Sequence, residues 1–315
     1  MKIILLLLLS TNLLADFLYP GFFGEELKQL IINDYKTTST LGYNNARDIM
    51  YSEIDIKPGN QLTGVYSGYT ITLNLSQDPS TNAYEQGINC EHTWPQSLGA
   101  GSEPMKSDMH HLFPTKSNVN SSRGNDPFEE INDNLTNKWY RNDYYIESVP
   151  LEFIDEYAEK YNPPNQNDER FEPREEQKGN TARAMAYFYT MYSDVADNNF
   201  WGLQKETLFN WHLEDYPDTD ELNRTWAIAS YQQNKPNPFV IDNSLMERIY
   251  FWEDILNGDI NVDHSLDVLD LVYMINIVIN QSTYSNEELT ILDANFDNSF
   301  NVLDMVIFVN NIIGE

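Results

Sequence analysis

The chain has 315 residues, of which 41% are hydrophobic, and its 49 acidic side chains outnumber 19 basic ones, giving a formal net charge of −30. This composition excludes a wholly disordered chain, and the length suits one large domain and one small one. Such an excess of acid repels polyanions in dilute salt. It therefore argues against nucleic acid as a partner, although salt and divalent cations weaken that repulsion.

The first fifteen residues, MKIILLLLLSTNLLA, combine one lysine, an apolar run and a small residue at Ala15. This pattern is typical of a secretory signal peptide and is too short for a stable membrane anchor, which is the alternative interpretation. No later apolar run is long enough to span a bilayer. We therefore expect residues 1–15 to be removed and the mature chain to be secreted, either extracellular or periplasmic. The single cysteine, Cys90, excludes an intramolecular disulfide.

Hydrophobic and β-branched patterns predict the elements of residues 16–252. Helical spacing of apolar residues predicts helices at 25–35, 180–195, 221–233 and 243–256, the last capped by Asn243 or Ser244. β-Branched and aromatic residues predict a strand or hairpin at 64–75 and a short strand at 144–154. Because the strands precede most of the helices, the expected fold class is α+β.

Residues 87–128 contain three of the five histidines, in the motifs CEH and SDMHH, followed by SNVNSSRGN. A phosphodiester hydrolase needs a base for water, a cation that stabilises the developing charge, and donors on the phosphate. A neutral histidine suits the base, a carboxylate with an amide oxygen suits Mg²⁺, and an arginine suits the phosphate. These motifs therefore supply a candidate for every role.

Other interpretations compete for the same residues. Cys90 and His92 would share one strand face, as in a Cys–His nucleophile, but nothing else supports acyl transfer. Cys90 with the histidines is a weak zinc candidate, because paired ligand spacing is absent. Loop histidines and aromatic residues are often structural, and we expect this for His110, His111, His212, Trp94 and Phe113.

The stretch NCEHTWPQS…SDMHHLFPTKSNVNSSRGN resembles the secreted bacterial endonuclease I family, and the likeness extends over about residues 24–252. It implies a His-metal ββα-finger nuclease domain at residues 16–252. It also implies that His92 is the general base and that Glu91 and Asn120 bind one divalent cation, Mg²⁺ or else Mn²⁺ or Ca²⁺. Arg123 would lie at the phosphate or behind the metal ligands.

The same resemblance assigns supporting roles. Asp108 and His110 match the residues that order the loop between strand and helix, and His111 holds a position that can touch DNA. For Arg183 the resemblance implies contact with backbone phosphate or bracing of the site. Because the bulk charge is acidic, a polyanion also needs local basic contacts: Lys116 and Arg183 are the expected substrate-binding cations, and Arg123 and Lys178 are further candidates. The implied products carry 5′-phosphates and arise with little sequence preference, from DNA and from RNA.

One difficulty concerns the neighbours Glu91 and His92. In a regular strand their side chains face opposite ways. If both approach one ion, the strand must twist or end there, and we expect such an irregularity.

Residues 253–315 contain twelve acids and neither lysine nor arginine, and they hold an internal repeat in which residues 261–279 align with 295–313. Nine of the nineteen aligned positions are identical. Oxygen-bearing side chains recur at positions 1, 3, 5, 7, 9 and 12 of two loops, a spacing that wraps a short loop around Ca²⁺. The alternative is an acidic surface without an ion. The predicted calcium-binding residues are Asp259, Asn261, Asp263, Ser265, Asp267 and Asp270, then Asp293, Asn295, Asp297, Ser299, Asn301 and Asp304.

These repeats resemble dockerin type I modules, which implies a small all-α module of two calcium-loop–helix repeats with a protein or cell-surface partner. Loop position 6, usually glycine in that family, holds His264 and Asn298. Because histidine tolerates a left-handed backbone poorly, we expect weaker binding in the first loop. Positions 10 and 11 are apolar in both loops, as at Val268 and Leu269, so we expect no binding to a cohesin.

The main hypothesis is a secreted, Mg²⁺-dependent endonuclease that hydrolyses DNA, with RNA as a second candidate substrate. Two hypotheses of other kinds remain. One is a non-catalytic, calcium-dependent interaction protein, and the other is a dockerin-bearing cargo enzyme of an extracellular complex.

Overall fold

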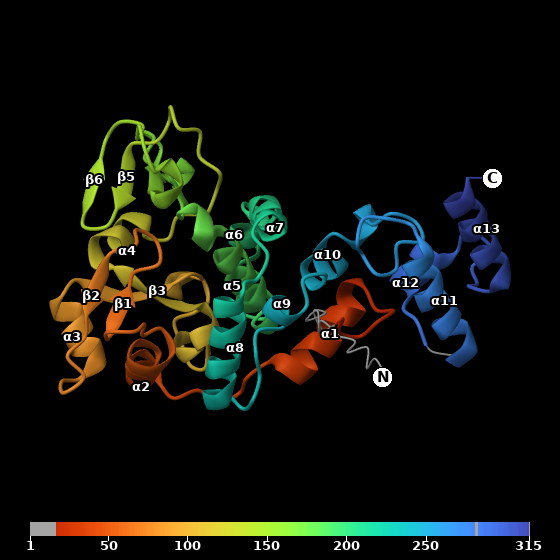
Figure 1. Ribbon diagram of the computed structural model, residues 1–315, viewed down its shortest axis with the longest axis horizontal. Helices are drawn as coiled ribbons and strands as arrows, with labels where there is room; N and C mark the ends of the chain where they lie inside the picture. Colours follow the sequence, from red (N-terminus) through yellow and green to blue (C-terminus); the bar gives the residue numbers. More distant parts are fainter. Residues whose placement is uncertain (1–16, 281–282, 315) are drawn as a thin grey trace, which may run out of the picture.

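The computed structural model describes residues 17–280 and 283–314, so the predicted leader lies outside the described residues. Figure 1 shows an elongated molecule with a mixed α and β part at one side and a helical C-terminal part at the other. Both helices and strands are present, which confirms the α+β class. Among the described residues, every helix is too short or too polar to cross a bilayer.

The N-terminal third pairs short strands with short helices. α1 (Gly24–Tyr35) confirms the first predicted helix and buries Leu27 and Ile31. α2 (Tyr43–Ile49) is followed by β1 (Gln61–Thr63), β2 (Thr70–Thr72) and α3 (Pro79–Glu85). β1 and β2 form a two-stranded antiparallel sheet. The strand or hairpin predicted at 64–75 is partly right, because residues 70–72 form β2, paired with β1 just before this range, and the other residues are turns and irregular chain.

The middle of the chain contains two further sheets. β3 (Ile88–His92) and β4 (Leu112–Lys116) form an antiparallel pair, and α4 (Ser117–Arg123) follows directly. β5 (Lys138–Arg141), β6 (Tyr144–Ile146), β7 (Ala158–Tyr161) and β8 (Arg170–Glu172) form a four-stranded antiparallel sheet in the order β6-β5-β7-β8. β6 accounts for only the first part of the strand predicted at 144–154.

Helices build the largest core. α5 (Lys178–Met191) is buried along nearly its whole length and packs against α7 (Lys205–Glu214). α6 (Asn198–Gly202), α8 (Thr219–Tyr231), α9 (Pro238–Ile241) and α10 (Leu245–Tyr250) complete this part. Trp94 and His212 are fully buried, as predicted. Ser244 is the N-cap residue of helix α10, as predicted, but its side chain donates to Asp242 and makes no capping hydrogen bond.

The C-terminal part contains α11 (Val268–Asn280), α12 (Asn286–Leu292) and α13 (Val302–Ile313). α11 and α13 follow the two predicted loops, whereas α12 was not predicted. Their small apolar core includes Phe308, Met274 and, from the N-terminal segment, Phe23. The boundary at residue 253 stays a prediction.

Candidate active site

β3 and β4 place the predicted catalytic segment at an open strand edge. They pair without interruption up to His92. In this register the carbonyl groups of Cys90 and His92 point away from β4, towards the unpaired side of β3. Open edges need partners for such groups. α4 supplies them.

Two side chains of α4 satisfy this edge. Asn120 Nδ2 donates to the Cys90 carbonyl over 3.1 Å, and Arg123 Nη1 donates to the His92 carbonyl over 3.2 Å. Arg123 Nη2 also donates to the Thr93 carbonyl over 2.8 Å. The turn from β4 into α4 therefore holds Asn120 and Arg123 beside β3.

Glu91 is the buried anion of this site, with 2% of its surface exposed. The Tyr66 hydroxyl donates to its Oε1 over 2.9 Å, and Arg123 Nη1 lies 3.3 Å from the same oxygen. Burial raises the pKa of Glu91 to about 7, against the opposing effects of Arg123 and Tyr66. Its negative charge is thus incompletely compensated, and a bound cation would favour the charged form. Tyr66 was missed by sequence reasoning, because nothing in its local pattern indicates this contact.

Asn120 offers a free acceptor. Its Nδ2 donates to Asn89 Oδ1 over 2.9 Å as well as to Cys90. Among the described residues, no hydrogen bond uses its Oδ1. An amide oxygen held in place through its own nitrogen, next to a buried carboxylate, is a suitable donor set for a hard divalent cation. The chemistry of Glu91 and Asn120 therefore fits the metal that the sequence predicts.

Arg123 is 1% exposed, and its guanidinium also stacks over Phe128, with its Cζ 4.6 Å from the ring centroid. Its polar contacts are to Glu91 and to backbone carbonyls. Arg123 was predicted to lie either at the phosphate or behind the metal ligands, and this environment supports the position behind the ligands.

His92 is held in one tautomer. Its Nε2 lies 3.0 Å from the Lys106 carbonyl, which only accepts, so Nε2 carries the proton and Nδ1 keeps its lone pair. Gln96 Nε2 lies 3.3 Å from Nδ1. Burial and the neighbouring His111 lower the pKa of His92 to about 3, so the ring is neutral at physiological pH. The carbonyl of Lys106 and the amide of Gln96 were not identified from the sequence.

The side chains of Glu91 and His92 take opposite faces of β3. Glu91 contacts Tyr66, whereas the His92 ring lies 5.3 Å from the ring of Tyr43 and 5.5 Å from that of His111. β3 ends at His92 and a bend follows at Thr93, so the strand ends where the sequence required it to twist or end.

Asp108 organises the loop before β4. It is fully buried and accepts hydrogen bonds from Tyr187 and Tyr192, over 2.8 and 2.7 Å, and from Gln232. Burial alone would raise the pKa of Asp108, but neighbouring histidines and these hydrogen bonds lower it. Its Oδ1 also accepts from the backbone amide of His110.

His110 and His111 are both buried. Their Nε2 atoms lie 2.9 Å from the Lys235 carbonyl and 2.7 Å from the Met105 carbonyl, respectively. These surroundings support structural roles. With no exposed surface, His111 is not positioned to touch DNA.

The two predicted substrate-binding cations differ in accessibility. Lys116 immediately precedes α4 and lies over the ring of Tyr69, with its Nζ 4.3 Å from the centroid. Arg183 is fully buried in α5, where it pairs with Glu221 over 2.5 Å and donates to the Asp215 carbonyl. Its surroundings support the bracing role, and as described it offers no surface to a phosphate.

Cys90 is a free, buried thiol, as predicted. Burial raises its pKa to about 12. A thiol that stays protonated is a poor nucleophile and a poor zinc ligand. The structure therefore supports neither the Cys–His nucleophile nor the zinc site that competed for Cys90.

Glu130, Glu172 and Glu175 form another cluster of carboxylates that could surround a cation. Lys178 Nζ lies 2.7, 2.8 and 2.7 Å from these three residues, so an ammonium group already compensates their charge. A cavity of about 270 Å³ beside it is lined mainly by acids, including Glu176. Such a cavity does not suit a polyanion.

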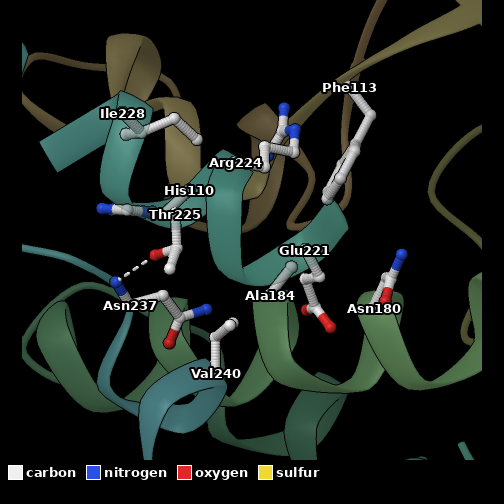
Figure 2. A pocket seen from close by; sticks show the side chains of 10 residues that line it. All are labelled: His110, Phe113, Asn180, Ala184, Glu221, Arg224, Thr225, Ile228, Asn237 and Val240. Carbon is white, nitrogen blue, oxygen red and sulfur yellow. Dashed lines mark hydrogen bonds between the residues drawn. The ribbon is translucent and has the colours of Figure 1, made fainter. Parts of the chain in front are cut away.

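A small cavity of about 30 Å³ lies between β4, α5 and α8. Figure 2 shows His110, Glu221, Asn237 and Arg224 among the side chains around it. Its volume suits about one water molecule and is too small for a nucleotide.

The two predicted calcium loops repeat each other's hydrogen bonds. Asp259 accepts from the backbone amides of residues 263 and 264, and Asp293 accepts from those of residues 297 and 298. Position 6 is left-handed in both loops, with φ of 64° at His264 and at Asn298. The oxygen-rich side chains thus hold two equivalent turns, and ion binding by them stays a prediction.

Known proteins resemble this chain over most of its length. The Endonuclease I family model matches residues 23–244. An extracellular ribonuclease of Bacillus subtilis (strain 168) is 27% identical over 237 residues, which cover 70% of this chain and 72% of the relative. An extracellular ribonuclease of Bacillus amyloliquefaciens is 28% identical over 169 residues, which cover 48% of this chain and 50% of that protein. With the family match spanning the β3–β4–α4 unit and most of the chain around it, the protein belongs to the Endonuclease I family.

Proposed function

We propose that the mature chain is an exported, metal-dependent endonuclease that hydrolyses phosphodiester bonds, with β3, β4 and α4 as a His-metal ββα-finger. Two observations support the proposal: buried Glu91 of β3 pairs with Arg123 of α4, and Asn120 of the same helix donates to the neighbouring Cys90 carbonyl and keeps its amide oxygen free. The names of the Bacillus relatives support export and a nucleic acid substrate.

Glu91 and Asn120 would hold one divalent cation, with Mg²⁺ preferred and Mn²⁺ or Ca²⁺ as alternatives. When bound, the cation would supply positive charge to the phosphate oxygens in the transition state. Arg123 orients Glu91 and adds positive charge behind it. His92, fixed by the Lys106 carbonyl, would take a proton from water at Nδ1. The low pKa of His92 keeps that nitrogen unprotonated, although it also weakens the base.

The proposed substrates are RNA and DNA, cleaved with little sequence preference to leave 5′-phosphates. The ribonuclease names of the relatives favour testing RNA first. The chain is highly acidic, so binding of a polyanion depends on local cations and on salt. Of the two predicted substrate-binding cations, Lys116 lies just before α4 and is partly exposed, whereas Arg183 is buried.

The C-terminal loops are proposed to bind two Ca²⁺ ions through the twelve residues predicted above. Burial, with Asp270 and Asp263 nearby, raises the pKa of Asp259 to about 6. Mutual repulsion of this kind is relieved by a cation of matching charge. The dockerin likeness of residues 253–315 stays part of this proposal.

A partner for the repeats is a second function, favoured by one specific observation. Val268, Leu269 and Val272 of α11 are at least 49% exposed, and residues 302, 303 and 306 repeat this on α13. Apolar surface presented twice at equal positions is typical of a protein-binding face. The cargo-enzyme and interaction-protein hypotheses both depend on it.

The enzyme proposal is tested with the full mature chain, incubated with single-stranded RNA and with supercoiled plasmid in MgCl₂ or in EDTA. We expect cleavage with MgCl₂, no cleavage in EDTA, and 5′-phosphate ends. Equal cleavage in EDTA would contradict the metal requirement. A chain that cleaves neither substrate with Mg²⁺, Mn²⁺ or Ca²⁺ would instead favour the interaction-protein hypothesis.

A further inference from the structure

Some lysines of the described chain have a carboxylate partner and others do not. In the described part of the chain, five lysines make ion pairs with carboxylates, at positions 28, 36, 160, 178 and 205. Of the others, Lys106, Lys116 and Lys138 each lie over a tyrosine ring. In so acidic a chain, lysines left without carboxylate partners are available to an external anion.

Lys138 and Tyr145 form one such pair on the β5–β6 hairpin. Lys138 Nζ lies 4.9 Å from the centroid of the Tyr145 ring. Tyr145 is 46% exposed, so much of the ring remains open to a ligand. The pairing of β5 with β6 sets Tyr145 opposite Tyr140, which keeps these side chains on one face of the hairpin.

This face is anchored to the helix that carries Asn120. The Tyr140 hydroxyl donates to Ser122 Oγ of α4 over 2.8 Å, and the rings of Tyr140 and Tyr145 lie 5.6 Å apart. Figure 1 likewise shows the β5–β6 hairpin next to α4. A continuous set of contacts thus links Tyr145 to the candidate active site.

Lys116 and Tyr69 form a second pair, just before α4 begins. Lys116 lies opposite Ile88 at the start of β3, whereas His92 lies at its end. Burial lowers the pKa of Lys116, and Asp143 in the β5–β6 turn opposes that shift. Because Asp143 interacts with Lys116, the β5–β6 turn lies near this second pair, and the Asp143 carboxylate offsets part of the charge of the lysine.

Stacking on aromatic rings and contact with cations are the two interactions by which proteins hold unpaired nucleotides. We propose that Lys138–Tyr145 and Lys116–Tyr69 are nucleotide subsites beside α4, in which the exposed ring of Tyr145 stacks on an unpaired base and the two lysines contact the flanking phosphates. The enzyme then prefers single-stranded nucleic acid. This inference rests on the proposed nuclease function and names the form of substrate that its site selects.

The hairpin supplies a matched control. Tyr144, 41% exposed, is the neighbour of Tyr145, but it lies opposite Arg141 and contacts the Tyr157 hydroxyl on the other face. Tyr145→Phe keeps the ring and removes only the hydroxyl. Thermal unfolding checks that each surface variant is folded.

The test measures fluorescence anisotropy in EDTA, without cleavage, using a labelled mixed-sequence single strand and the duplex of the same sequence. We expect Tyr145→Ala to weaken single-strand binding by roughly tenfold or more and to leave duplex binding within about twofold. Tyr144→Ala and Tyr145→Phe should bind as wild type. Lys138→Gln should reduce the salt dependence of single-strand binding by about 0.7 in the log–log slope.

Two results would overturn the subsites. One is equal single-strand affinity for Tyr145→Ala and Tyr144→Ala, and the other is an equal loss for single strand and duplex. If wild type still cleaves nucleic acid with Mg²⁺, only the subsites fail. If wild type neither binds nor cleaves nucleic acid, the nuclease proposal fails and the subsites with it.

Discussion

The candidate active site and the C-terminal repeats both contain candidate ligands for a cation, but they are built in different ways. In the first repeat, Asp259 and Asp270 bond to backbone amides no more than ten residues away. Glu91, in contrast, depends on Tyr66, 25 residues earlier, and on Arg123 in the following helix. Local spacing therefore specifies a loop, whereas an active site depends on contacts that the fold alone brings together.

The largest expected effect breaks the active site at its free acceptor. Asn120→Ala should lower cleavage with Mg²⁺ by about 100-fold or more, because charge stabilisation by a bound metal is worth several kcal/mol. Asn120→Asp, which keeps an oxygen in place, should retain more activity. Asn118→Ala, an exposed position on the same helix, is the control. Equal rates for the alanine variants at positions 118 and 120 would remove Asn120 from the metal site.

Removal of calcium should act on the other region alone. We expect EGTA to destabilise residues 253–314 by about 3 kcal/mol for each ion lost, relative to Ca²⁺ at 100 times its Kd, because the ion binds the folded loops and not the unfolded chain. Calorimetry measures this, and Mg²⁺-dependent cleavage serves as the control that should persist. A double variant, Asp259→Ala with Asp293→Ala, should not respond to Ca²⁺. If Ca²⁺ does not change the unfolding of the wild-type protein, the result would contradict ion binding by the loops.

A smaller effect concerns pH and the sheet beside the site. Glu159 of β7 pairs with Glu172 of β8, and burial followed by repulsion from Glu172 raises the pKa of Glu159 to about 8. Because this folded pKa exceeds the unfolded value, the free energy of unfolding should fall as pH rises from about 4.5 through 8. Glu159→Gln should therefore stabilise the protein by about 2 kcal/mol at pH 9 and leave it nearly unchanged at pH 5. Urea unfolding at both pH values measures the difference, and an equal effect at the two would contradict the assigned shift.

The smallest effect distinguishes the two repeats. His264 and Asn298 share the same left-handed backbone, but histidine is the more strained. His264→Gly should tighten Ca²⁺ binding by about 1 kcal/mol, roughly fivefold, and Asn298→Gly by less. Calorimetric titration of both variants checks the order. A larger gain at position 298 would reverse our view of which loop is weaker.

The sequence predicted those parts of the molecule that follow from local pattern. The helices α1, α5 and α8 follow from apolar periodicity, and burial of Cys90 and Trp94 follows from residue type. The strands were predicted poorly, because β2 and β6 have three residues each and their pairing depends on distant partners.

Within the site, the motif identified Glu91, His92 and Asn120, but it gave no indication of Tyr66 or of the Lys106 carbonyl. These groups reach the site through tertiary contacts at long range. The burial of Arg183 could not be predicted from the sequence either, because a basic residue in a helix is usually exposed.

The central claim, that His92 is the base of a metal-dependent nuclease, is tested most directly by single-turnover cleavage of RNA and plasmid by wild type and His92→Ala in Mg²⁺, with and without added imidazole. We predict a rate loss of about 10²- to 10⁴-fold for the variant, partly restored by imidazole, with unchanged thermal unfolding. Cleavage by His92→Ala at the wild-type rate would contradict the claim.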